Sequence, residues 1–345
     1  MANQEENLPQ KNVIVDEGVR NEGARWKPLT EGPPHIYENP PLVSIVILNY
    51  NGQVFIRRCL ETVLKSDYPN KEIILVDNAS GDNSLQMAKV YADRITIVLN
   101  PRNYGFARGC NEGIKHSHGS IIILLNVDTC VRPGWAEGLV LAMLQDPTVG
   151  VAGSKLLFLN GSTIQHAGGT IAPNCMSHHI GYGERDQAQH DTYREVAYVT
   201  GASLAVRRDL LDAIGLLDEG FPMYYDDLDL ALAAQRHGYK VVYVPSSVVL
   251  HFETFGTERN SKRYYYQYHR GRIRFLLKNY GLRYIVRTFI PAELEWYHLT
   301  NLRAQLLPLI LAYLVNVPKA PYFLVRGFIV RRTARPLVKP PAQPN

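Results

Sequence analysis

Short apolar runs alternate with segments of helical periodicity through the first half of the chain. Runs of four to eight consecutive apolar residues are typical of strands that are buried on both faces of a parallel sheet. Between them, apolar residues recur at the spacing of one helix face, and the alternation predicts right-handed β-α-β units. The fold class expected is α/β, with a mainly parallel central sheet flanked by helices. The predicted strands lie at 43–48, 73–76, 95–99, 121–125, 149–152 and 241–250, and the predicted helices at 56–64, 84–91, 105–115, 135–144 and 226–238.

Composition divides the chain into three stretches. Residues 1–40 are rich in Glu, Asn, Gly and Pro and predict a loosely ordered arm. The α/β pattern fills residues 41–280 and predicts one globular domain. Residues 281–345 hold nine Lys or Arg residues against two acids, and they predict a helical segment that is both apolar and basic.

Charge and cysteine content exclude several classes of protein. The net charge of +5 resides in the C-terminal stretch, which does not fit a nucleic-acid-binding surface on the main domain. The four cysteines form no CxxC pair, so neither a zinc site nor a disulfide framework is expected. The N-terminus is polar and lacks the apolar core that a secretory signal needs, so a cytoplasmic location is expected.

Polar clusters follow three of the predicted strands: Asn49-Tyr50-Asn51, Asp77-Asn78-Ala79-Ser80 and Asn126-Val127-Asp128. Such residues also favour turns and helix N-caps, which is the alternative explanation for any one cluster. Ligands of parallel sheets bind beyond the carboxyl ends of the strands, where all three clusters converge. Neither GxGxxG nor a P-loop follows the first strand, which excludes those two routes of nucleotide binding.

Three further features carry candidate chemistry. Gly105, Gly109 and Gly113 form a bare stripe that predicts close helix packing, with Arg108 beside it as a cation for a diphosphate. Three aspartates, of which Asp227 is the second, open a predicted helix; they suit the helix dipole, and one of them could serve as a general base. His251 ends the last apolar run and is either structural or a metal ligand.

The ordered set of motifs resembles glycosyltransferase family 2, especially its rhamnosyltransferase-like branch. The resemblance covers about 42–281 and rests on VSIVILNYNG, YPNKEIILVDNASGDNS, NPRNYGFARGCNEGI, LLNVDT, VTGASLAVRR and FPMYYDDLDLALAAQRHGY. It implies a GT-A fold, with a Rossmann-like sheet, over residues 41–280. The implied activity is transfer of a sugar, with rhamnose as the first candidate, from a nucleoside-diphosphate donor to a saccharide or lipid-linked acceptor.

The resemblance also assigns residues. Asp77 would contact the nucleobase, with Asn49, Tyr50 and Asn51 beside it, while Asn126 and Asp128 occupy the position of the DxD motif. Asp128 and His251 would bind Mg²⁺ or Mn²⁺, for which an oxygen ligand is suitable. Asp227 would be the catalytic base, and direct displacement would invert the anomeric configuration.

Three positions depart from the family pattern. Asn126 replaces the first aspartate of DxD, Asp226 replaces the usual glutamate before the base, and Gly271 stands where asparagine is expected. A nucleotidyltransferase and a binding protein without catalytic activity are the alternative functions. The first lacks its glycine-rich phosphate loop here, and only Asn126 favours the second.

The C-terminal segment predicts contact with a membrane. The apolar run 306–317 contains Pro308 and is shorter than the roughly 20 residues that span a bilayer. Apolar faces flanked by arginine over 281–335 favour a peripheral helix on the inner face of the cell membrane, which would suit a lipid-linked acceptor. A helical subdomain packed on the core, or a homo-oligomer interface, is the alternative.

Overall fold

The computed structural model describes residues 39–221, 223–252, 261–300 and 302–333. The predicted arm at 1–40 lies outside the described residues except for its last two positions. The central sheet follows the order β10-β12-β6-β11-β4-β1-β2-β3, and β5 and β7 are added to β12 and β6. Its strands are β1 (Val43–Asn49), β2 (Lys71–Asp77), β3 (Thr96–Leu99), β4 (Ile121–Asn126), β5 (Thr129–Val131), β6 (Val149–Leu157), β7 (Ile164–His166), β10 (Arg194–Glu195), β11 (Ser203–Arg207) and β12 (Lys240–His251).

The α/β fold class is confirmed, and the sheet is mixed. The β3-β2-β1-β4 half is parallel throughout, as the alternating pattern predicts, and β12 is also parallel to β6. Between these two parallel groups, β11 runs antiparallel to both β4 and β6. Strand β11 is short and follows a long excursion, so no helix of the β-α-β pattern precedes it.

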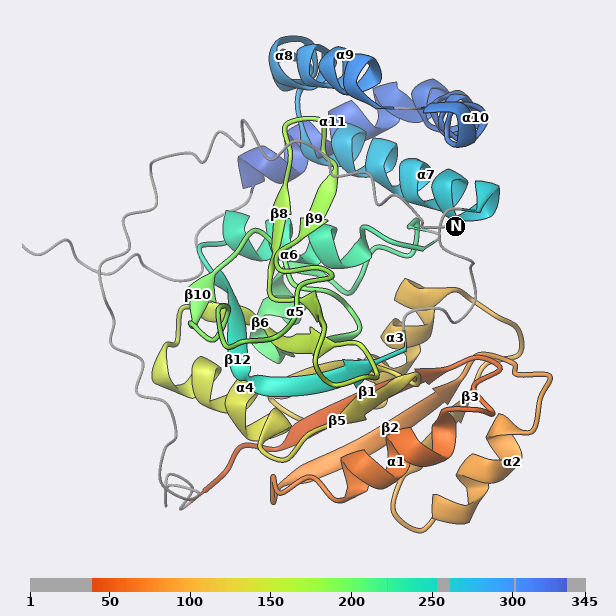
Figure 1. Ribbon diagram of the computed structural model, residues 1–345, viewed down its shortest axis with the longest axis vertical. Helices are drawn as coiled ribbons and strands as arrows, with labels where there is room; N and C mark the ends of the chain where they lie inside the picture. The colour runs from red at the N-terminus through yellow and green to blue at the C-terminus, as the bar shows by residue number, and fades with distance from the viewer. Residues whose placement is uncertain (1–38, 222, 253–260, 301, 334–345) are drawn as a thin grey trace, which may run out of the picture. The chain divides into compact units, whose positions relative to one another are not determined.

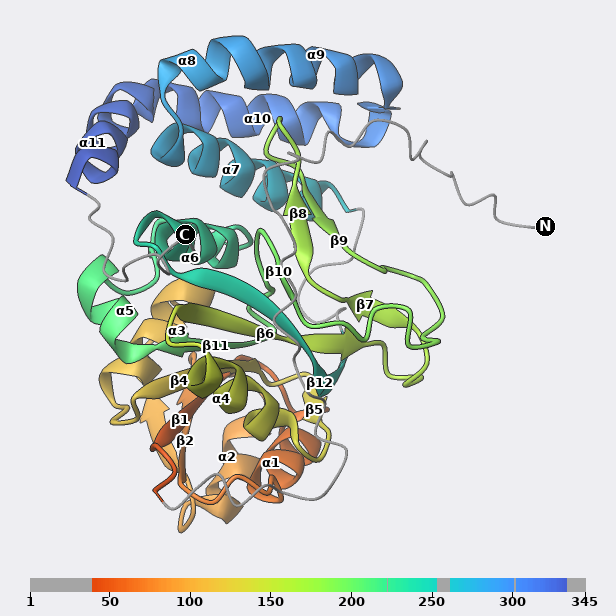
Figure 2. The same ribbon diagram turned by 90° about the vertical axis from the view of Figure 1, so that its left-hand side faces the viewer.

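Helices cover both faces of the sheet (Figures 1 and 2). A hydrophobic core lies on each face of the sheet, and the side chains of β1 alternate between the two. Val46 packs with α3 (Phe106–Lys115), whereas Ile45 and Ile47 pack on the opposite face with α1 (Ile56–Leu64) and α4 (Trp135–Gln145). Burial on both faces explains why β1 is a continuous apolar run. The other helices of these two layers are α2 (Ser84–Ala88), η1 (Lys89–Tyr91), α5 (Arg208–Ile214) and α6 (Asp226–Arg236).

The glycine stripe of α3 brings that helix against the sheet. A Cβ atom on Gly109 would lie 2.5 Å from Leu48 Cδ1, and one on Gly113 would lie 2.3 Å from Val46 Cγ1. No side chain fits at either distance, so the backbone of α3 can pack at this depth only with glycine. The predicted packing role of the stripe is confirmed.

A layer of helices follows α7 (Lys262–Asn279), above the β8–β9 hairpin of Gly169–Ile171 and Ser177–His179 in Figure 1. It comprises α8 (Leu282–Tyr284), η2 (Ile285–Phe289), α9 (Ile290–Leu299), η3 (Leu302–Ala304), α10 (Leu306–Asn316), η4 (Val317–Lys319) and α11 (Ala320–Thr333). Both α10 and α11 pack against α7, which joins the layer to the main domain.

One buried ion pair ties this layer together. Arg272 of α7 is fully buried, and its two terminal nitrogens donate to the two carboxylate oxygens of Glu293 on α9, each at 2.6 Å. Tyr313 of α10 donates to the same carboxylate at 2.9 Å, and Arg272 also donates to the carbonyl oxygen of Asn174 beside the hairpin. Three helices and the hairpin therefore share one bidentate contact.

The apolar run near residue 306 continues farther than its sequence indicates. Helical structure from Leu306 to Val325 makes a 20-residue segment of mean hydropathy 1.3, of which 28% is buried. By length and composition this longer segment is a candidate membrane span, whereas the prediction considered only the 12-residue run 306–317. Its packing on α7 is equally consistent with a helix that stays beside the domain.

We expect Glu293→Gln to lower the free energy of unfolding by about 3–5 kcal/mol, because the guanidinium of Arg272 would stay buried without its counter-charge. Urea unfolding followed by circular dichroism measures this. Glu112→Gln, in the half-exposed pair with Lys115 on α3, is the matched control and should cost less than about 1 kcal/mol. Equal losses in the two variants would contradict the structural role of the buried pair.

Candidate active site

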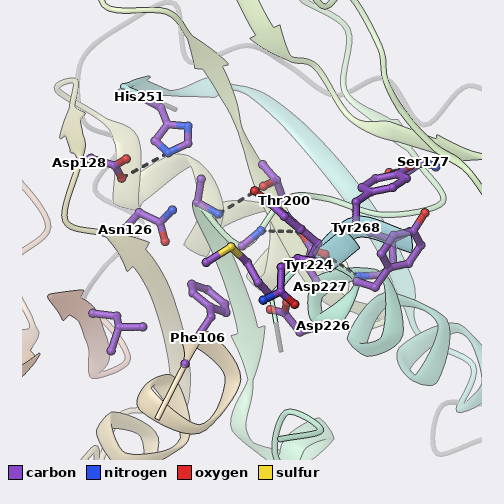
Figure 3. Close-up of a pocket in the computed structure, with 18 of the residues that line it drawn as sticks. Phe106, Asn126, Asp128, Ser177, Thr200, Tyr224, Asp226, Asp227, His251 and Tyr268 are labelled. Atoms are coloured by element: carbon purple, nitrogen blue, oxygen red, sulfur yellow. Dashed lines mark hydrogen bonds and ion pairs between the residues drawn. The ribbon is translucent and has the colours of Figure 1, made fainter. Parts of the chain in front are cut away.

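Backbone pairing brings Asp128 and His251 together. Asp128 directly precedes β5, which runs antiparallel to the end of β12 with Thr129 opposite His251. The backbone N–H of Phe252 donates to the carbonyl oxygen of Asp128 at 3.0 Å. In consequence His251 Nε2 lies 3.3 Å from Asp128 Oδ1, and both side chains are almost fully buried (Figure 3).

These two residues border a cavity of about 490 Å³. Its wall also includes Tyr50, Asn126 and Asp227, so five of the nine predicted site residues share one cavity. Figure 3 shows Asp227 between the Asp128–His251 pair and the side chains of Ser177 and Tyr268. The carboxyl ends of the strands thus form one part of the cavity, and the start of α6 forms another.

A strained turn presents Asp227. Tyr224 and Tyr225, which directly precede α6, have positive φ values of 65° and 72°, in the left-handed region that aromatic residues rarely occupy. Asp227 is the second residue of α6 and lies in its first turn. Its Oδ2 accepts the backbone N–H of Gly201 at 3.0 Å, and its Oδ1 accepts that of Leu228 at 2.9 Å. Two backbone donors fix the carboxylate at the cavity wall.

The pKa values of the two adjacent aspartates are raised to different extents. Burial raises the pKa of Asp226 well above its ordinary value, and the charge of Asp227 raises it further. Burial also raises the pKa of Asp227, but the N–H groups of Gly201 and Leu228 oppose the rise. Asp227 therefore ionises first, and Asp226 is the neutral partner. A carboxylate with a raised pKa is a stronger proton acceptor than an exposed one.

An aromatic wall lines the cavity beyond Asp227; no motif in the sequence analysis identified it. It consists of Tyr198, Tyr224, Tyr264 and Tyr268. The rings of Tyr264 and Tyr268 stack with centroids 6.0 Å apart, and Ser177 of the hairpin donates its N–H to the Tyr268 hydroxyl at 3.0 Å. The signal available in the sequence is the run of tyrosines at 264–268, which a helix could also have placed outward.

Gly271 has a packing reason for its departure from the family pattern. A Cβ atom there would lie 2.9 Å from the carbonyl oxygen of Tyr224 and 3.1 Å from the ring of Tyr225. A larger side chain would push α7 away from the strained turn before Asp227. Glycine at this position allows α7 to pack on that turn.

The predicted nucleobase residues form their own network. Asn49 Nδ2 donates to Asp77 Oδ1 at 2.8 Å, and Ser80 donates to both carboxylate oxygens of Asp77. Asn51 has a positive φ of 52° and accepts the N–H of Gly81. Asn49, Asn51 and Asp77 do not line the cavity that holds Asp128. Their contact with a nucleobase stays a prediction.

Arg108 also lies apart from the cavity. Its guanidinium stacks over the ring of Tyr104 at 3.8 Å and pairs with Glu219 at 3.7 Å. It lines a separate depression formed by β3 and α3, together with Tyr104 and Glu112. A contact of Arg108 with a diphosphate stays a prediction that this position does not favour.

Comparison with known proteins identifies the family of the chain. Residues 44–215 match the family model for Glycosyl transferase family 2. The chain belongs to glycosyltransferase family 2.

Two relatives show how similar this family 2 glycosyltransferase is to other proteins in sequence. The uncharacterized protein y4gI of Sinorhizobium fredii is 30% identical over 233 residues, which cover 63% of this chain and 25% of that protein. The chain thus spans a quarter of the length of this relative. The N-acetylglucosaminyl-diphospho-decaprenol L-rhamnosyltransferase of Mycobacterium tuberculosis is 24% identical over 257 residues, which cover 68% of this chain and 84% of that enzyme.

A solved structure confirms the GT-A fold of the glycosyltransferase. The crystal structure of GalNAc-T7 with UDP, GalNAc and Mn²⁺ superimposes with a TM-score of 0.59 at 17% sequence identity. The match covers 77% of this chain and 53% of that one. At this identity the comparison carries the fold alone.

The residues present in the glycosyltransferase fit a divalent cation that is shared with a substrate. Among the described residues, no group of three or more His, Cys, Asp or Glu side chains could hold a metal by itself. Asp128 and His251 offer one carboxylate and one imidazole at the cavity wall. Mg²⁺ is often held by one or two protein ligands, with phosphate oxygens and water completing the shell. A cation here would need such oxygens from the donor.

We expect Asp227→Asn to lower kcat of the glycosyltransferase by 10²-fold or more, because the amide cannot accept the proton. Asp226→Asn mimics a neutral acid and should lose less than tenfold. The acidic limb of the kcat/KM profile should lie above pH 3.8, since activity falls as pH drops through the raised pKa of Asp227. Initial rates between pH 4 and 9 measure both effects. Similar losses in the two variants would contradict the assigned protonation.

Proposed function

We propose that the chain is an inverting, metal-dependent glycosyltransferase that transfers a sugar to a hydroxyl group of a saccharide or lipid-linked acceptor. The observation that carries the proposal is the shared cavity, in which Asp227 faces the space bordered by Asp128 and His251. Displacement of a nucleoside diphosphate requires a group that takes the proton of the acceptor and ligands for a cation bound to the diphosphate. Asp227 suits the first role, and Asp128 with His251 suits the second.

The proposed reaction is a single displacement. Asp227 takes the proton of the acceptor hydroxyl while that oxygen forms a bond to the anomeric carbon. The bond between the anomeric carbon and the diphosphate oxygen breaks, and the nucleoside diphosphate leaves. Asp128 and His251 would hold Mg²⁺ or Mn²⁺, which when bound would neutralise the charge of the departing diphosphate. Attack from the face opposite the leaving group inverts the anomeric configuration.

For the donor we propose rhamnose carried by a nucleoside diphosphate, with Asp77 and its neighbours Asn49 and Asn51 at the base. Support for rhamnose comes from the name of the Mycobacterium tuberculosis relative. Support for the base position comes from the location of Asp77 at the end of β2, next to the strands that carry the cavity. The aromatic wall would take the acceptor, because sugar rings have apolar faces that pack on tyrosine.

Product analysis separates this function from its alternatives. With a donor panel of nucleotide sugars and MnCl₂, we expect release of a nucleoside diphosphate, abolished by EDTA and reduced 10²-fold or more in Asp128→Asn. Release of pyrophosphate would instead support a nucleotidyltransferase. If the donor raises the thermal stability of the protein but no product forms in the presence of lipid-linked acceptors, the result would support a binding protein without catalytic activity.

We also propose that the C-terminal layer contacts the membrane at its inner, cytoplasmic face, where a lipid-linked acceptor would be reached. Exposed apolar side chains lie on the outer surfaces of its helices, with exposed Arg283, Arg287, Arg303 and Lys319 among them. Apolar surface flanked by cations matches an anionic lipid surface. The exposed apolar residues are Leu282, Val286, Ile290, Leu294, Leu299, Leu306, Leu307, Ile310, Leu311, Leu314, Val317, Tyr322 and Val325.

We expect the protein to sediment with vesicles containing phosphatidylglycerol, and Leu311→Glu with Leu314→Glu to weaken this binding at least about tenfold, since apolar burial of two leucines is lost. Val90→Glu, at an exposed position on η1, is the matched control and should bind as the wild type. If the wild type ignores vesicles and the double variant instead dissociates an oligomer, as measured by light scattering, the apolar face joins two copies and the membrane proposal is wrong.

A further inference from the structure

Gln165 makes a buried contact with the proposed metal ligand His251. The glutamine is 2% exposed, and its Oε1 lies 2.7 Å from His251 Nδ1, across 86 positions of sequence. Both residues line the cavity. On the other side of the imidazole, Nε2 lies 3.3 Å from Asp128 Oδ1. The ring of His251 is therefore held between an amide and a carboxylate.

The chemistry of this contact fixes the tautomer of a neutral His251. A carbonyl oxygen of an amide only accepts hydrogen bonds, so the ring nitrogen facing it must carry the proton. With the proton on Nδ1, the lone pair of Nε2 points to the side of Asp128. That nitrogen is then available as a ligand, and the carboxylate beside it supplies the second one.

The backbone places Gln165 at an irregular position. Strand β7 pairs with β6 through Ile164 opposite Leu157 and His166 opposite Leu156, so the register shifts by one residue and Gln165 falls between the two pairs. Such bulges reorient a side chain and are frequent next to active sites. Strand β12 pairs with the same end of β6 from its other side, through Leu250 and Leu157.

We propose that Gln165 is a positioning residue, which holds His251 in the Nδ1–H tautomer and directs Nε2 to a divalent cation shared with Asp128. The inference rests on the metal dependence of the proposed function. Hydrogen bonds to the second nitrogen of a metal-binding histidine fix its orientation and commonly change metal affinity by about 10–100-fold. None of the motifs in the sequence analysis includes Gln165.

The first test measures Mn²⁺ affinity with UDP present to supply diphosphate oxygens, and free Mn²⁺ is followed by electron paramagnetic resonance in a titration with MnCl₂. Gln165→Leu removes the acceptor and should weaken binding about 10–100-fold. Gln165→Glu keeps an accepting oxygen and should bind within about threefold of the wild type. Gln235→Leu is the matched control, because Gln235 on α6 is partly buried but donates to the carbonyl oxygens of Val196 and Ala197.

The second test reads the tautomer directly, with ¹⁵N-histidine labelling and two-bond ¹H–¹⁵N correlation spectra at neutral pH without metal. His251→Gln identifies the signal of His251. We expect Nδ1–H in the wild type and in Gln165→Glu, and a shift towards Nε2–H in Gln165→Leu. Circular dichroism and thermal midpoints establish that each variant is folded, so a lost signal is not mistaken for unfolding.

The outcomes separate the two proposals. Mn²⁺ binding by the wild type with unchanged affinity in Gln165→Leu overturns the role of Gln165 and leaves the metal-dependent function standing. An Nε2–H tautomer or an imidazolium in the wild type also overturns it. An Nδ1–H tautomer in a protein that binds no Mn²⁺, even with UDP present, overturns the proposed metal dependence and with it the inference.

Discussion

The antiparallel pairing of β5 with the end of β12 is the constraint on which the site depends. Because Thr129 lies opposite His251, residues that are more than 120 positions apart in sequence meet within 3.3 Å. The pairing also closes the backbone hydrogen bonds of both segments, so the position of the carboxylate beside the imidazole is fixed by the fold. A shift of one residue in this register would turn one of the two side chains to the other face of the sheet.

A second constraint fixes the position of Asp227 on the opposite wall of the cavity. The left-handed conformations of Tyr224 and Tyr225 set the start of α6, and the N–H groups of Gly201 and Leu228 hold Asp227 there. Close packing of α7 over this turn depends on Gly271. The helical layer packs against α7, and the ion pair between Arg272 of α7 and Glu293 of α9 joins the two. The proposed base therefore depends on contacts far from the cavity.

Local pattern was enough to predict the parallel half of the fold. Buried parallel strands such as β1 and β2 need apolar side chains on both faces, and this leaves a clear run in the sequence. Strands β5, β7 and β11 have only three to five residues, and distant partners determine their pairing, so the sequence contains no apolar run that predicts them.

The candidate site shows the same difference between local pattern and tertiary contact. Asp128, His251 and Asp227 could be named from motifs, whereas Gln165 and the aromatic wall could not. Their roles arise from a bulge and from tertiary packing. Arg108 lies outside the cavity although it is adjacent in sequence to the glycine stripe, because its guanidinium stacks on Tyr104 and pairs with Glu219.

The proposed mechanism requires that Asp128 and His251 hold one divalent cation in the cavity that Asp227 faces. Anomalous diffraction at the manganese edge, from crystals grown with MnCl₂ and UDP, tests it most directly. We expect one strong peak within bonding distance of both Asp128 and His251 Nε2, with diphosphate oxygens completing the shell. A peak bound elsewhere, or an ordered diphosphate in the cavity with no manganese beside these two residues, would contradict it.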